Sequence, residues 1–208
     1  MNIASMTTKQ WYRTLLENNV TMKQQEDNNQ RVLIPIKTEI RYPNVNWDRS
    51  WSFTRLSGLA SEQSSFLFKM LHNILPTKSR LFRLHQTDDP ACSLCTSGNS
   101  EDTSHALLSC NFNTAEVNNW IIEIAKKVSP NSTLQDIVTL NLDLEECNIY
   151  PMIWSLSHMF IMVWQHRVSK KAFTLYTVRA TLEAKMNILR KSRLSAKADQ
   201  IAVMLNLM

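Results

Sequence analysis

The stretch Cys92–Cys110 reads CSLCTSGNSEDTSHALLSC and holds three of the four cysteines of the 208-residue chain. Cys92, Cys95, His105 and Cys110 follow the spacing C-x2-C-x9-H-x4-C. The two-residue gap allows a tight turn to aim two sulfur atoms at one point, and the longer loop returns the chain with a third sulfur and an imidazole. This ligand set favours Zn²⁺ over hard cations such as Mg²⁺. The stretch therefore predicts a zinc ion as the cofactor.

Two other interpretations of the Cys92–Cys95 pair stay open, namely a chance pair and a redox pair. A redox pair usually begins a helix that follows a strand, and this context is missing here. If zinc is bound, all four ligands come from the protein, so the site is structural and not catalytic. Cys147 is expected to be a buried thiol and not a fifth ligand.

The five-residue separation of His105 and Cys110 restricts the local structure, because residues five apart do not share a face of an ideal α-helix. We expect Glu101 or Asp102 to open a short helix that carries His105. Cys110 then lies at or beyond the C-terminal end of that helix.

Helical patterns flank this segment on both sides. Apolar residues at helical spacing predict a helix over Ser61–Leu75, which Pro76 ends, and Thr77 then caps a second short helix. Downstream, the same spacing predicts helices over Thr114–Lys127 and Tyr150–Arg167, and the latter is apolar nearly all round, so it should lie centrally. Further helices are expected over residues 7–22, 169–193 and 195–207.

Composition supports an all-α fold, a helical bundle with an inserted CCHC zinc knuckle. Hydrophobic residues make up 44% of the chain, whereas the two glycines are too few for most turn-rich β folds or dinucleotide-binding sheets. We divide the chain into an N-terminal helix with an irregular lead-in (1–60), a helical pair with the zinc-binding domain (61–127) and a C-terminal helical region that packs on it (128–208). Trp47 and Trp51 lie in an irregular stretch, 41–54, and should cover the edge of the core.

Four motifs around the cysteines occur in a characteristic order. An apolar helix ends in Leu75-Pro76-Thr77, and the basic stretch Lys78–Leu81 (KSRL) follows it. Asp89–Cys95 (DPACSLC) then carries the first ligands, Glu101–Cys110 (EDTSHALLSC) carries the last, and Trp120 lies downstream. Together they resemble the zinc-binding region that follows the polymerase domain in LINE-type (non-LTR) retrotransposon reverse transcriptases. That family's later helix often ends in Trp-x-x-Arg-Asn, and here Trp164–Val168 reads WQHRV, without the Asn. The resemblance implies the same four zinc ligands.

The polymerase itself is not expected in this chain. A reverse transcriptase palm needs an aromatic-x-Asp-Asp turn to hold two catalytic metal ions. The only Asp-Asp pair is Asp88-Asp89, and Gln86-Thr87 precedes it. No nucleotide loop, activated nucleophile or spaced carboxylate set stands out, so we expect no enzyme activity.

A basic stretch next to the cysteines is the candidate surface for RNA or DNA. Residues 63–87 contain no acidic residue, and Lys69, Lys78, Arg80 and Arg83 could contact phosphates. A solvated helix face is the alternative interpretation. The net charge of +5 and the pI of about 9.1 fit either one. Residues 167–208 are also basic, but their cations flank an apolar stripe, so we expect at most a secondary contact surface.

Two hypotheses for function follow. The first is a non-catalytic, nucleic-acid-associated zinc domain derived from the C-terminal part of a reverse transcriptase, with RNA or DNA and possibly a polymerase domain as partners. The second is a protein-interaction or scaffold module whose zinc only maintains the fold. The N-terminus shows no signal-peptide pattern and residues 152–164 are too short to span a bilayer. We therefore expect an intracellular protein, nuclear or cytoplasmic, without a membrane partner.

Overall fold

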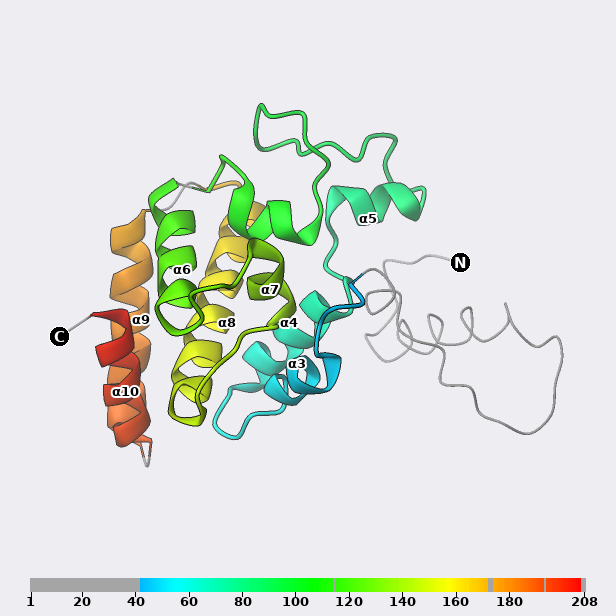
Figure 1. The fold of residues 1–208 in the computed structure, drawn as a ribbon. Coiled ribbons are helices and arrows are strands. Elements are labelled where there is room, and N and C mark those ends of the chain that lie inside the picture. The colour runs from blue at the N-terminus through cyan, green and yellow to red at the C-terminus, as the bar shows by residue number, and fades with distance from the viewer. Residues whose placement is uncertain (1–41, 114, 172–173, 193, 207–208) are drawn as a thin grey trace, which may run out of the picture. The chain divides into compact units, whose positions relative to one another are not determined.

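A computed structural model describes residues 42–113, 115–171, 174–192 and 194–206, and the regular secondary structure of this part of the chain is helical (Figure 1). Within it, strand-like pairing is limited to one antiparallel bridge between Ala91 and Ser100. The prediction of an all-α fold is confirmed. The helices are α3 (Trp47–Phe53), α4 (Ser61–Leu71), α5 (Lys78–Arg83), the π-helical turn η3 (His105–Ser109), α6 (Ala115–Val128), α7 (Leu134–Thr139), α8 (Glu146–Ser169), α9 (Leu175–Arg190) and α10 (Ser195–Leu205).

Helix α8 lies at the centre of the core, as its apolar sequence predicts. All its side chains from Tyr150 to Val163 are buried, and α4, α6, η3, α9 and α10 pack around it. Each neighbour contributes one apolar face, such as Val117, Trp120, Ile121 and Ile124 from α6 or Val178, Leu182 and Met186 from α9. A single hydrophobic cluster extends from Phe53 to Leu205. The elements that carry the cysteines are therefore attached to one continuous core.

Two short helices, α3 and α7, were not expected. The prediction that residues 41–54 are irregular is wrong over α3, because the Asn46 side chain accepts a hydrogen bond from the Arg49 N–H and starts a helix there. Trp47 and Trp51 of α3 are partly buried against the core, as predicted. Helix α7 begins with a reciprocal capping box between Thr133 and Asp136.

Several helices end earlier than the apolar pattern predicts. Helix α4 ends at Leu71 and not at Leu75, since Asn73 adopts a left-handed conformation with φ 52°. The predicted helix over residues 169–193 is likewise shorter, because Lys170 ends α8 with φ 53° and Thr174 caps α9 afresh. A left-handed residue other than glycine is uncommon, so periodicity alone did not reveal these breaks.

The predicted helix over residues 7–22 lies outside the described residues. Residues 35–208 form one compact unit that includes all the described elements. The division at residues 60 and 127 stays a prediction. Among the described helices, none is both long enough and apolar enough to cross a bilayer.

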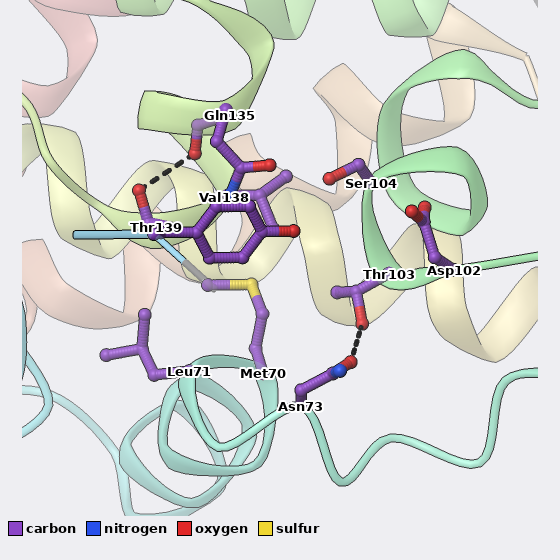
Figure 2. A pocket seen from close by; sticks show the side chains of 10 residues that line it. Met70, Leu71, Asn73, Asp102, Thr103, Ser104, Gln135, Val138 and Thr139 are labelled. Atoms are coloured by element: carbon purple, nitrogen blue, oxygen red, sulfur yellow. Dashed lines mark hydrogen bonds between the residues drawn. The ribbon is translucent and has the colours of Figure 1, made fainter. Parts of the chain in front are cut away.

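A small pocket lies between α4, α7 and the residues that precede η3 (Figure 2). Apolar side chains of Met70, Leu71 and Val138 form one side, and the polar side chains of Asn73 and Thr103 are hydrogen-bonded to each other at 3.0 Å. Its volume of about 20 Å³ has room for roughly one water molecule. A pocket of this size cannot hold a nucleotide.

Candidate metal centre

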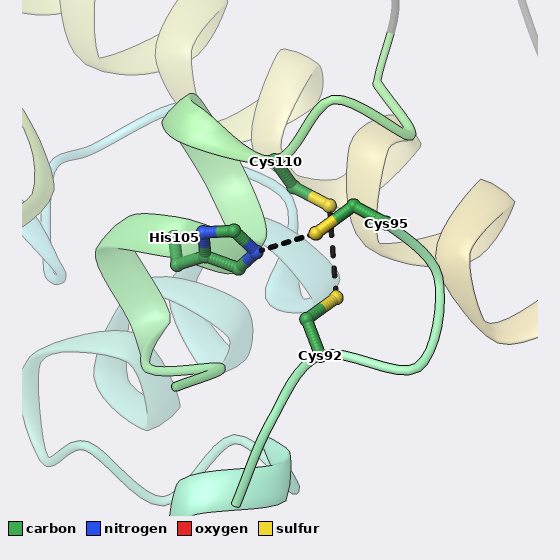
Figure 3. A group of neighbouring side chains, drawn as sticks. All are labelled: Cys92, Cys95, His105 and Cys110. Carbon is green, nitrogen blue, oxygen red and sulfur yellow. Dashed lines mark hydrogen bonds between the residues drawn. The ribbon is translucent and has the colours of Figure 1, made fainter. Parts of the chain in front are cut away.

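The side chains of Cys92, Cys95, His105 and Cys110 meet at one point (Figure 3). Their ligand atoms all lie within 4.8 Å of one another, so the group could hold a metal ion. The Sγ atoms of Cys92 and Cys110 are 3.7 Å apart, and Cys95 Sγ lies 3.4 Å from His105 Nε2. The sequence therefore predicted correctly which side chains come together.

A short hairpin supplies the first two cysteines. The Cys92 N–H donates to the Asn99 carbonyl at 2.9 Å, and the Glu101 N–H donates to the Pro90 carbonyl at 2.9 Å. Gly98 turns the loop with φ +67°, a backbone conformation that residues other than glycine rarely adopt. Backbone N–H groups of Leu94 and Cys95 hydrogen-bond to the Cys92 sulfur. The hairpin is thus a knuckle whose amide groups face the Cys92 sulfur.

The π-helical turn η3 explains how His105 and Cys110 can share a site although five residues separate them. An α-helical turn joins residues four apart, whereas a π-helical turn joins residues five apart. Helical structure begins at Thr103, and the Asp102 carboxylate accepts the His105 N–H at 2.8 Å. The backbone of Cys110 is extended and ends the helix. The predicted opening by an acidic residue and the position of Cys110 are confirmed, while the π geometry was not foreseen.

Two buried asparagines, which no sequence pattern pointed to, hydrogen-bond to the backbone of this turn. Asn113 Nδ2 donates to the Ala106 carbonyl at 3.1 Å, and Asn118 Nδ2 donates to the Cys110 carbonyl at 3.3 Å. One contact lies in the first half of η3 and the other lies just after its end. The ligand-bearing backbone is therefore held from the side of α6.

The cysteine thiols lie in different electrostatic environments. Burial raises the pKa of Cys92 to about 11, against hydrogen bonds from Arg167 and the backbone that favour the thiolate. Cys95 is more open, and although burial opposes ionisation, hydrogen bonds from Ser97 and His105 lower the pKa of its thiol to about 6. A bound cation would favour the thiolate form at both positions.

The donor set and its spacing fit a tetrahedral zinc ion. Zinc–sulfur bonds of about 2.3 Å place two sulfurs of a tetrahedron about 3.8 Å apart, and a sulfur and a nitrogen about 3.6 Å apart. The observed separations of 3.7 and 3.4 Å agree with these values. The Cys92 and Cys110 sulfurs are too far apart for a disulfide, which needs about 2.0 Å, and the cysteines are free. Cys92, Cys95, His105 and Cys110 could therefore hold the ion, with zinc as the expected metal.

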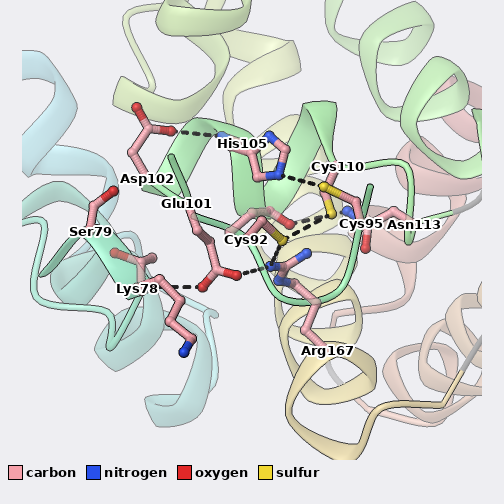
Figure 4. A network of polar contacts seen from close by, with 12 residues as sticks. Lys78, Ser79, Cys92, Cys95, Glu101, Asp102, His105, Cys110, Asn113 and Arg167 are labelled. Carbon is pink, nitrogen blue, oxygen red and sulfur yellow. Dashed lines mark hydrogen bonds and ion pairs between the residues drawn. The ribbon is translucent and has the colours of Figure 1, made fainter. Parts of the chain in front are cut away.

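A buried ion pair adjoins the cysteines (Figure 4). Arg167, from the last turns of α8, donates from Nη2 to Glu101 Oε2 at 2.6 Å and to Cys92 Sγ at 3.5 Å. The other oxygen of Glu101 accepts the Lys78 N–H at the start of α5, at 3.1 Å. Although burial acts in the opposite direction, hydrogen bonds to Cys92 and Cys110 and the charge of Glu101 raise the pKa of Arg167. The only sequence signal for Arg167 was the Trp-x-x-Arg ending of its helix.

The four predicted nucleic-acid residues differ in their surroundings. Lys69 and Arg83 are exposed, and Lys78 and Arg80 are half-buried. Arg80 Nη1 donates to the Asn73 carbonyl at 3.0 Å, so it stabilises the α4–α5 turn, and burial together with Arg83 lowers its pKa. Arg83 Nε donates to the Ser79 carbonyl within α5. The ammonium group of Lys78 points away from the cysteines (Figure 4).

Cys147 is not a buried thiol, and that prediction is wrong. It is exposed in the first turn of α8, and its Sγ lies 3.8 Å from the Glu145 carboxylate. Cys147 precedes the buried run of α8, which begins at Tyr150.

Comparison with known proteins agrees with the geometry of this centre. No curated protein and no solved structure matches the chain. The family model described as "zinc-binding in reverse transcriptase" matches residues 7–116, which is more than half of the 208 residues and includes all four converging side chains. The matched model describes a zinc-binding domain and not a polymerase domain. The chain therefore belongs to the family of zinc-binding domains of reverse transcriptases.

Proposed function

We propose that this chain is a non-catalytic domain that binds one structural zinc ion and associates with RNA or DNA. The convergence of Cys92, Cys95, His105 and Cys110 on one point carries the zinc part of the proposal. All four positions of a tetrahedral ion would be filled by protein, which leaves none for a water or substrate. The family to which the chain belongs supports the same conclusion.

The zinc part is tested by elemental analysis. The purified chain should contain about one zinc per molecule, and a Cys95→Ser variant should contain almost none. Cys147→Ser is the matched control, because this exposed cysteine lies outside the group, and it should retain full zinc content. A wild-type protein without zinc, or equal zinc in both variants, would overturn the assignment.

Cationic side chains beside the centre support the nucleic-acid part. Lys69, Lys78 and Arg83 are exposed or half-exposed, and the described acidic residues nearest in sequence to α5 lie outside residues 63–87. Their ammonium and guanidinium groups are donors of the kind that pair with phosphates without reading base sequence. Arg80 is fixed by its contact with Asn73, so its role on this surface is to add charge.

The nucleic-acid part is tested by the salt dependence of binding to a single-stranded RNA and a duplex DNA. Lys69→Gln, Lys78→Gln and Arg83→Gln together should weaken binding and reduce the slope of log K against log salt by about 0.7–0.9 for each lost phosphate contact. The control triple variant Lys126→Gln, Lys127→Gln and Lys191→Gln removes the same charge from exposed sites on α6 and after α9.

The same binding measurements distinguish the nucleic-acid function from the alternative, a protein-interaction or scaffold module. Equal weakening by both triple variants would show that only net charge matters and that the assigned surface is wrong. Absence of binding by zinc-loaded protein near 50 mM salt would leave the protein-interaction or scaffold module as the better description, with zinc confined to maintaining the fold.

A further inference from the structure

Arg167 connects two parts of the molecule that are distant in sequence. It follows the buried run of α8, yet its guanidinium reaches Glu101 and Cys92, which precede it by 66 and 75 residues. Only 4% of its side chain is exposed, and only 9% of that of Glu101. A charged pair that is buried to this degree contributes little net stability unless further partners satisfy it.

The electrostatics of the centre give Arg167 a second partner. Three thiolates, one neutral imidazole and Zn²⁺ would carry a net charge of −1 beside the Glu101 carboxylate. The guanidinium lies between these two negative groups, with Nη2 on both Glu101 and Cys92. Its Nη1 is buried and has no hydrogen-bond partner among the described residues. The ion pair alone therefore leaves this side chain incompletely satisfied.

We propose that Arg167 is a positioning residue for the zinc ion and links its binding to the docking of α8. By donating to Cys92 Sγ it fixes the position of that sulfur, and by its pair with Glu101 it holds the knuckle and the start of α5 against the core. Zinc occupancy and order in the last turns of α8 then stabilise each other. This inference requires the proposed zinc ion but not the proposed nucleic-acid binding.

The first experiment needs no substitution, so it does not depend on a variant that folds. Amide hydrogen exchange is compared in zinc-loaded wild-type protein and after removal of zinc by a chelator. Exchange should accelerate in residues 92–110 and also in residues 163–169 at the end of α8, while residues 150–160 should change little. Unchanged exchange in residues 163–169 would overturn the proposed link.

The second experiment measures zinc affinity by competition with a chromogenic chelator. Arg167→Met should weaken zinc binding about 10- to 100-fold, the usual effect of losing a partner of a metal ligand. Arg167→Lys retains the charge without the forked geometry and should give an intermediate loss. Arg190→Met is the matched control, because Arg190 also pairs with a carboxylate, Asp199, but on exposed parts of α9 and α10.

A spectroscopic readout separates positioning of the ligand from general stability. With Co²⁺ in place of zinc, the thiolate-to-metal charge-transfer band should shift in Arg167→Lys and stay unchanged in Arg190→Met. Wild-type affinity and an unshifted band in the Arg167 variants would overturn the inference while leaving the zinc site itself intact. A wild-type protein that binds no zinc would instead overturn the proposed function.

Discussion

Helix α8 and residues 72–113, which we call the zinc-binding segment, are ordered by different interactions. Helix α8 buries an unbroken run of side chains from Tyr150 to Val163. Within the zinc-binding segment, α5 has no buried residue at all, and its start is held by the Thr77 cap and the Glu101 carboxylate. Apolar burial is thus sufficient for the central turns of α8, whereas α5 and the knuckle depend on polar contacts and the four converging ligands.

This difference explains why the zinc-binding segment, and not the core of α8, needs a metal centre. Burial of apolar surface contributes about 25 cal/mol per Å² and stabilises α8 without any bound ion. The knuckle has too little apolar surface for that, and a structural zinc ion supplies the missing free energy in such segments. The two regions should therefore respond differently to the removal of metal, to core substitutions, to acid and to the loss of helix caps.

Metal removal should produce the largest effect. Structural zinc sites bind with apparent free energies of about 10–16 kcal/mol, more than the whole stability of many domains. A strong chelator should abolish most exchange protection in residues 92–102 and leave the central turns of α8 protected, as measured by hydrogen exchange. Loss of protection throughout α8 would show that zinc, and not apolar burial alone, stabilises the centre of this helix.

A core substitution should reverse this pattern. Phe160 of α8 is completely buried, so Phe160→Ala should lower the free energy of unfolding by about 3–5 kcal/mol, measured by urea denaturation of zinc-loaded protein. Phe82→Ala on α5 is the control, because this ring is 43% exposed and should cost much less. Equal losses would contradict the view that α5 receives little stability from apolar burial.

Acid should destabilise the core through His158. Burial, with the nearby Lys185 adding to it, lowers the pKa of this imidazole from 6.5 to about 3, and its ring packs edge-on against Trp154 at 4.3 Å. The unfolded chain takes up a proton near pH 6.5 but the folded chain does not, so stability should fall as pH decreases from about 6.5 towards 3. The limiting slope is about 1.4 kcal/mol per pH unit.

The measurement that checks this is the pH dependence of unfolding in metal-free protein, which removes the contribution of acid-labile zinc. His158→Phe keeps an aromatic ring against Trp154 and should flatten the slope between pH 6.5 and 5. An unchanged slope would assign the acid sensitivity to other groups.

Helix caps should give the smallest effects. Thr133→Ala removes the hydroxyl that accepts the Asp136 N–H at the start of α7 and should lower the free energy of unfolding by about 1 kcal/mol. Thr77→Ala removes the equivalent contact with the Arg80 N–H on α5. In metal-free protein the Thr77 substitution should leave the main thermal transition in place, since α5 is then not part of the cooperative core. Equal shifts in melting temperature would refute this separation.

The features that the sequence revealed are those encoded over short distances. Ligand spacing identified Cys92, Cys95, His105 and Cys110, and apolar periodicity identified α4, α6 and α8. The short helices α3 and α7 were missed because a helix of one or two turns shows little apolar periodicity. Such a helix depends on a capping residue, here Asn46 for α3 and Thr133 for α7.

Other features depend on contacts that a linear pattern does not contain. Arg167 is 75 residues from Cys92 in sequence, so only the packing of α8 brings it to the centre. The exposure of Cys147 was misjudged because it lies one turn before the buried run of α8. The nucleic-acid surface stays a prediction, and the contact of Arg80 with Asn73 shows that a basic residue can serve the fold as well.

The π-helical turn also affects how the chain can change in length. Among residues 105–109, only Ser109 is exposed, while His105, Ala106, Leu107 and Leu108 are buried. Deleting Ser109 would leave His105 and the following cysteine four residues apart, a separation that an ordinary α-helical turn brings to one side. A one-residue deletion there would exchange one helical geometry for another and preserve the ligand pair. The spacing between the third and fourth ligands is therefore less strictly constrained than the spacing within the Cys92–Cys95 turn.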